Sequence, residues 1–226
     1  MAGLSDSDLE RLLNEPQYAS DFQYFIGDVE DFLDFSENNI EWQYRAELQR
    51  IRRETATGDW PRGYREHLEQ NAEHRFKVSL PLRVRYGAVI ALITSVEWSI
   101  GYLAKRLKAP ISEKPKGRNG IVHALLELQK RTGVGTRNII EDYEALVHLR
   151  NCIAHCAGME EHYEYRDQLG ASVSRLNGVS LENWHFLGKH ICICKGALNP
   201  YIREMGAIVV ALHKAIHEQG LLQSGT

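Results

Sequence analysis

The fold is decided by the stretch PLRVRYGAVIALITSVEWSIGYLAKRLK, residues 81–108. Its apolar residues fall on nearly every side of a helix, a pattern typical of a helix that is surrounded by other helices. Pro81 suits the first position of a helix, where an amide hydrogen has no helical partner. We therefore predict a central helix from Pro81 to about Lys108, in a mainly α, up-and-down helical bundle.

The same stretch is also the one segment apolar enough to suggest a membrane span, between Tyr86 and Ala104. Glu97, together with neighbouring Ser and Thr residues, is unfavourable against lipid, so we predict no membrane contact. The N-terminus lacks the basic start and apolar run of a signal peptide. We therefore expect a cytoplasmic protein.

Helical periodicity extends outward from the central helix in both directions. It predicts helices at residues 5–13, 22–56, 64–76, 119–131 and 136–156. No periodicity is visible after Gly158 until residues 177–196. There Ile191 and Ile193 alternate with the cysteines and indicate a small β-hairpin. Asn199, as N-cap before Pro200, is expected to open the last helix. We predict one domain over residues 1–226, with an acidic helical extension at about 1–57 and a hairpin insertion at about 173–196.

The composition is that of an ordinary globular protein, with 43% hydrophobic and 25% charged residues and a net charge of −3. These values exclude a disordered chain, a collagen-like fibre and a disulfide-rich miniprotein. Charge is unevenly distributed, because residues 1–41 contain eleven Asp and Glu against Arg11 alone. This acidic arm is either a solvated helix face or a segment that covers a basic site or binds a partner.

The most basic stretch runs from Lys105, at the end of the central helix, to Arg118 and is the candidate for contact with an RNA backbone. Its six cations are Lys105, Arg106, Lys108, Lys114, Lys116 and Arg118. The four cysteines lack the spacing of a zinc site, and we interpret them as reduced, small buried residues. A single helix cannot supply four tetrahedral ligands from the His and Cys residues of 148–156, so we predict no metal.

The candidate chemistry lies in LRNCIAHCAG, residues 149–158, which contains Arg150, Asn151 and His155. Arginine presents a charged fork to phosphate oxygens, and histidine exchanges a proton near neutral pH. Such a pair can cleave RNA without a metal. On a helix Asn151 and His155 share a face, but Arg150 and His155 lie roughly 140° apart. Either the arginine curls round the helix, or two copies of the helix complete one site across a two-fold axis.

The string RNCIAH resembles the Arg-Asn-x3-His motif of the HEPN superfamily (higher eukaryotes and prokaryotes nucleotide-binding domains). The resemblance implies a stand-alone, metal-independent endoribonuclease in a toxin, phage-defence or RNA-processing role, without a cofactor. A homodimer would then build a composite cleft in which Arg150 and His155 are catalytic and Asn151 supports them. An antitoxin or regulatory protein is a further implied partner. Ala157 stands where toxins with a minimal nucleotidyltransferase antitoxin usually carry tyrosine.

Two other interpretations of the motif stay open. The first is a non-catalytic HEPN module that binds RNA, a nucleotide or a partner protein through the same cleft. The second is a structural bundle, in which Arg150 and His155 stabilise the end of their helix through its dipole. Glu97 is a further candidate, because a carboxylate in a core helix needs a partner, and we expect that partner to be Arg150. The alternative is a partly exposed glutamate at the edge of the bundle.

Overall fold

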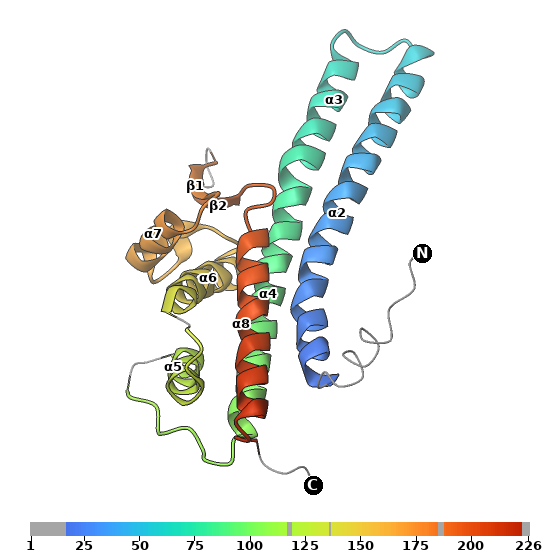
Figure 1. The fold of residues 1–226 in the computed structure, drawn as a ribbon. Helices are drawn as coiled ribbons and strands as arrows, with labels where there is room; N and C mark the ends of the chain where they lie inside the picture. The colour runs from blue at the N-terminus through green and yellow to red at the C-terminus, as the bar shows by residue number, and fades with distance from the viewer. Residues whose placement is uncertain (1–16, 117–118, 136, 185–187, 223–226) are drawn as a thin grey trace, which may run out of the picture.

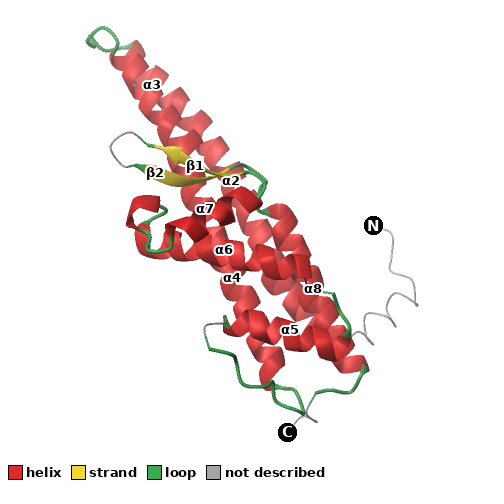
Figure 2. Ribbon diagram, turned by 90° about the vertical axis from the view of Figure 1, so that its left-hand side faces the viewer, coloured by secondary structure: helices red, strands yellow, loops and turns green. Residues whose placement is uncertain are grey.

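The computed structural model describes residues 17–116, 119–135, 137–184 and 188–222. Within these residues the chain is mainly helical, with one antiparallel β-hairpin before the last helix, which confirms the predicted fold class (Figures 1 and 2). The helix predicted at residues 5–13 lies outside the described residues.

The first two helical segments form a long antiparallel hairpin that extends beyond the rest of the fold (Figure 1). Helix α2 (Gln17–Ala56) ends before a loop, and α3 (Tyr64–His74) runs back. Helix α3 continues through a π-helical turn (Arg75–Ser79) into α4 (Leu80–Lys105). The prediction of a separate helix beginning at Pro81 is therefore wrong, because residues 64–105 form one continuous helix.

The π turn explains how the helix passes through Pro81. Proline donates no backbone hydrogen bond, and its ring crowds the carbonyl four residues earlier. In the wider turn the Leu80 amide donates to the carbonyl of Arg75, five residues back. The wider ring of atoms accommodates the proline without a break in the helix. At its other end α4 stops at Lys105 rather than Lys108, because the chain there pairs with the segment after the last helix, Leu107 forming a β-bridge with Leu222.

By length and composition, the helix over residues 64–105 could cross a membrane. A helix at the core of a fold passes the same test, and 50% of its most apolar window is buried here. The finding is therefore weak evidence for a membrane span.

The second half of the chain packs against this helical framework. Its elements are α5 (Gly120–Thr132), α6 (Arg137–Cys156), a 3-10 turn (Glu160–His162), α7 (Arg166–Arg175), β1 (Val179–Asn183), β2 (Lys189–Ile193) and α8 (Asn199–Glu218). Helix α7 lies where no regular element was expected. It has only ten residues and too few apolar side chains to show helical periodicity in the sequence. The hairpin therefore begins at Val179 and not near residue 173. Leu198, without a side-chain cap, occupies the N-cap of α8, so the predicted Asn199 cap is wrong.

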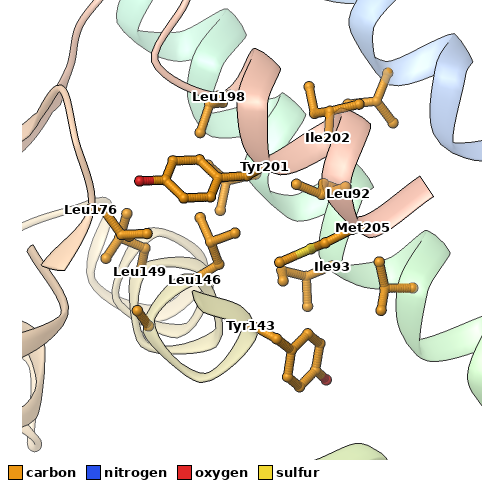
Figure 3. Close-up of a cluster of buried hydrophobic side chains, with 14 of the residues drawn as sticks. Leu92, Ile93, Tyr143, Leu146, Leu149, Leu176, Leu198, Tyr201, Ile202 and Met205 are labelled. Atoms are coloured by element: carbon orange, nitrogen blue, oxygen red, sulfur yellow. The ribbon is translucent and has the colours of Figure 1, made fainter. Parts of the chain in front are cut away.

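Helices α2, α4 and α8 lie side by side, while α5 and α6 cross them and are seen end-on (Figure 1). Helix α8 runs parallel to α4, and α2 runs antiparallel to both. The central core forms where α4, α6 and α8 meet, with Leu92, Leu146 and Met205 each 2% exposed or less (Figure 3). This packing fixes the rotation of α6 and thereby decides which of its side chains reach the surface.

Candidate functional site

Helix α6 presents the motif from its last two turns. Leu146, Leu149 and Ile153 are buried and hold one side of the helix against the core. His155 and the neighbouring Ala154 are exposed, whereas Arg150 is half-buried. The helix ends at Cys156 as predicted, and the next two residues take the left-handed conformation, Ala157 at φ 53° and Gly158 at φ 85°.

Arg150 forms an ion pair with Glu97 of α4, as the sequence predicted. Its Nη2 donates to Oε1 of Glu97 at 2.5 Å, and the two side chains are 26% and 33% exposed. The Tyr143 hydroxyl donates to the same oxygen at 3.3 Å. Burial, reinforced by the Glu97 charge, raises the pKa of Tyr143, which keeps this hydroxyl protonated. Glu97 therefore accepts from two donors and also lies at the partly exposed edge of the bundle.

The Nε of Arg150 is buried without a hydrogen-bond partner among the described residues. A buried donor left unsatisfied costs about 1–3 kcal/mol. The Arg150 guanidinium is thus held by one carboxylate and keeps an unused donor.

Asn151 contacts a different group from the two residues it was expected to support. Its side chain hydrogen-bonds to the hydroxyl of Tyr163, which opposes the rise that burial causes in the pKa of that tyrosine. Nδ1 of His148 lies 3.1 Å from the same hydroxyl. Asn151 and His148 therefore hold Tyr163, in the segment after α6, against the helix. Neither contact involves Arg150 or His155.

His155 lines an open pocket of about 620 Å³ between the first turns of α4 and the C-terminal end of α6. Arg150 is not part of its lining, so one chain does not bring the two motif residues into one pocket. Of the described residues, one arginine and two histidines line its surface, and no Asp or Glu does. Its lining consists of Arg83, Tyr86, Gly87, Ile90, Ile153, Ala154, His155, Cys156, Ala157, Met159 and His162.

Arg83 and His162, which were not predicted as site residues, share this pocket with His155. Neither residue belongs to a recognisable motif. The available signal was spacing, since Arg83 and Ile90 are seven residues apart and so lie on one face of α4. Both are exposed. His162 is placed by the turn after α6, which the sequence pattern did not reveal.

The basic segment after α4 lies away from the pocket. Lys105 is about 22 Å along the helix from Ile90, and the following loop leaves from the end of α4 opposite to α3 (Figure 1). Arg106 stacks over the ring of Tyr102, with its Cζ 5.4 Å from the ring centroid. Lys108 donates to the carbonyl of Gly220 at 2.7 Å. Lys114 and Lys116 are exposed, and Arg118 lies outside the described residues.

The described part of the acidic arm contributes to packing as well as to a solvated face. Glu30 pairs with Arg203 of α8 at 2.6 Å, and Glu37 pairs with Arg85 of α4 at 2.7 Å. Asp28, which lies between the buried residues of this helix, is exposed. Part of the acidic charge on α2 therefore fixes the helix to its neighbours.

The cysteines are free, as expected, but they are not all buried. Cys152 is buried, Cys156 and Cys192 are half-buried, and Cys194 is exposed, so the interpretation as small core residues is wrong for Cys194. Strand β2 ends at Ile193, which places the next side chain outside the sheet. No group of three or more His, Cys, Asp or Glu side chains in the described part of the chain is placed to hold a metal ion.

Comparisons of the chain with protein-family models, with curated proteins and with solved structures find no match.

Proposed function

We propose that this chain is a metal-independent endoribonuclease of the HEPN type, with His155 and Arg150 as its catalytic residues. The observation that carries the proposal is the exposed His155 at an open pocket whose described lining contains no carboxylate. Among the described residues the His155 ring has no hydrogen-bond partner, so it is available for proton transfer. A pocket that lacks acidic side chains favours a polyanion such as RNA.

The reaction needs no group beyond the RNA and the protein. The ribose 2′-oxygen forms a bond to phosphorus while the bond from phosphorus to the 5′-oxygen breaks. One general base takes the 2′-hydroxyl proton and one general acid supplies a proton to the leaving oxygen, and His155 fills one of these roles. Arginine stabilises the charge that develops on the phosphorane-like transition state. The products are a 2′,3′-cyclic phosphate and a 5′-hydroxyl.

A homodimer would bring the two motif residues together, with Arg150 from one copy facing His155 of the other. The support for this arrangement is exposed apolar surface on α4 and α2, of which Ile90 lines the pocket. Ile90 and Trp98 of α4 are 37% and 51% exposed, and Phe25 of α2 stacks on Trp98 with ring centroids 5.2 Å apart. Exposed apolar surface of this kind favours association, here with a second copy of the chain.

The second candidate function is a non-catalytic module that binds RNA, a nucleotide or a protein through the same cleft. The observation that favours it is the ion pair with Glu97, which engages the arginine that catalysis requires. A catalytic Arg150 would have to exchange this partner for a phosphate. Its unused Nε donor supports such a rearrangement, because a phosphate oxygen would satisfy it.

The test is incubation of the purified protein with total RNA in EDTA, followed by analysis of the cleavage products. We expect His155→Ala to reduce the cleavage rate about 10²–10⁴-fold, and Arg150→Ala about 10²–10³-fold, with unchanged circular dichroism. Lys130→Ala serves as a control, since Lys130 is an exposed residue of α5. Cleavage that persists in His155→Ala would refute the proposed chemistry, and an intact, RNA-binding but inactive wild type would favour the module.

Complementation between chains tests the composite cleft. A mixture of His155→Ala and Arg150→Ala protomers contains heterodimers in which one of two sites is complete. Random exchange should then restore about a quarter of the wild-type rate. A monomeric, fully active protein in analytical ultracentrifugation would contradict the dimer.

A further inference from the structure

The arginine that lines the His155 pocket is Arg83, not the motif residue Arg150. Arg83 lies in the first turns of α4, one turn before Gly87 and two turns before Ile90, and all three line the pocket. The opposite wall comes from the end of α6 and the turn that follows it. Arg83 thus faces the same open space as His155.

The side chain of Arg83 has no competing partner in the described part of the chain. It is exposed and makes no hydrogen bond or ion pair within the described residues. Among the described residues no Asp or Glu lines the pocket, and its other ionisable groups are His155, His162, the thiol of Cys156 and the hydroxyl of Tyr86. An unpaired guanidinium beside two imidazoles gives the pocket a positive charge that favours an anionic ligand.

The other arginines near the site are engaged in contacts within the protein. Arg85, two residues away on the same helix, pairs with Glu37 at 2.7 Å and donates to the carbonyl of Ile193 at 2.8 Å. Its side chain is only 16% exposed. Arg150 is half-buried and paired with Glu97. Of these three arginines, Arg83 alone is free to bind a ligand.

The uncharged lining of the pocket suits the remainder of a nucleotide. Ile90, Ile153 and Met159 contribute apolar surface beside the charged groups. A volume of about 620 Å³ is within the range of small-ligand sites. The Tyr86 hydroxyl donates to the carbonyl of Ile191 at 2.6 Å and is therefore not available to a ligand. Arg83 is then the charged hydrogen-bond donor on the α4 side of the pocket.

We propose that Arg83 binds a phosphodiester of single-stranded RNA in the His155 pocket, within the same chain. This assignment rests on the proposed function for the identity of the ligand. Arg83 thereby gives His155 a phosphate-binding arginine from its own chain, while Arg150 serves the cleft of the partner copy.

The probe is a fluorescein-labelled 2′-O-methyl oligoribonucleotide, which has no 2′-hydroxyl to attack the phosphorus. Its binding is measured by fluorescence anisotropy at two salt concentrations, for the wild type and for Arg83→Gln. We expect Arg83→Gln to weaken binding at least about tenfold and to reduce the slope of log affinity against log salt by about 0.7. Arg83→Lys should keep the wild-type slope, because it keeps the charge.

Arg62→Gln is the matched control, since it removes one exposed arginine in the loop between α2 and α3. That loop lies at the far tip of the helical hairpin (Figure 1). We expect wild-type affinity and salt slope from this variant. An equal loss of affinity in both variants would show that the effect depends only on net charge and would overturn the assignment. Wild-type affinity in Arg83→Gln, or no binding by the wild type, would overturn it as well.

Further outcomes distinguish this assignment from a free-phosphate site and from the proposed endoribonuclease activity. Inorganic phosphate that displaces the oligonucleotide at matched phosphate concentration would identify a free-phosphate site and overturn the assignment to RNA. If the wild type binds the oligonucleotide through Arg83 but does not cleave natural RNA, the binding assignment is supported and only the proposed endoribonuclease activity is refuted. Cleavage of natural RNA by a protein whose binding ignores Arg83 would refute the assignment and retain the endoribonuclease.

Discussion

Gly158, two residues after the end of α6, gives the sharpest test of how the pocket is built. Its φ of +85° is a left-handed conformation, and a Cβ there would lie 2.1 Å from Oη and 2.7 Å from Cζ of Tyr86. Tyr86 is 4% exposed, and its hydroxyl donates to the carbonyl of Ile191. The ring therefore cannot swing aside without losing this hydrogen bond. Gly158→Ala should distort the wall of the pocket as well as the turn.

The expected loss of folding stability in Gly158→Ala has two parts. The left-handed conformation costs an alanine about 1–2 kcal/mol, and overpacking against a fixed neighbour adds about 1–3 kcal/mol. The free energy of unfolding should thus fall by about 2–5 kcal/mol. Gly133→Ala is the matched control, because Gly133 has φ +75° and nothing within 4 Å of its added Cβ. That variant should lose only the first part, about 1–2 kcal/mol.

The assay is urea unfolding followed by circular dichroism, with the wild type and both variants in one buffer. The steric part should also be coupled to the ring, so Gly158→Ala combined with Tyr86→Phe should cost less than the sum of the single changes. The reasoning is refuted if Gly158→Ala costs no more than Gly133→Ala.

Two further perturbations test the electrostatics around the site and in the core. Glu97→Gln removes the charge partner of Arg150, and we expect the free energy of unfolding to fall by about 1 kcal/mol, since both side chains are partly exposed. Burial lowers the pKa of His213 in α8, so the folded state resists protonation. Stability should therefore fall as the pH drops below about 6.5, by up to about 1.4 kcal/mol per pH unit for this group, and His213→Gln should flatten the dependence. Urea unfolding over a pH series measures both.

Each of these two predictions has its own control. Glu41→Gln breaks the more exposed pair with Arg45, 55% and 73% exposed, and should change the free energy of unfolding by less than about 0.5 kcal/mol. An equal loss from both glutamine variants would mean that the Arg150 pair has no special role. For the histidine, burial also lowers the pKa of His148 and His190, so part of the pH dependence should remain in His213→Gln. A pH profile identical to that of the wild type would contradict the assignment to His213.

The sequence by itself determined most of the helical content and the ion pair beside the motif. Apolar residues at helical spacing set the positions of α2, α4, α5, α6 and α8, because each helix must bury one face to be stable. The partner of Glu97 could be predicted because a carboxylate in an apolar helix requires a nearby cation. Both results follow from local pattern and from the cost of burying charge.

The tertiary structure alone decided how the helix passes Pro81 and which side chains surround His155. A proline is normally a reliable helix boundary, but a π turn that packs against α2 carries the helix through it. The angle at which α6 crosses α4 determines which residues of α4 meet His155. That angle places Arg83 at the pocket and Arg150 outside it, although Arg150 lies only five residues from His155 in the sequence. Spacing along one helix fixes relative direction, whereas the neighbours of a side chain depend on how separate helices pack.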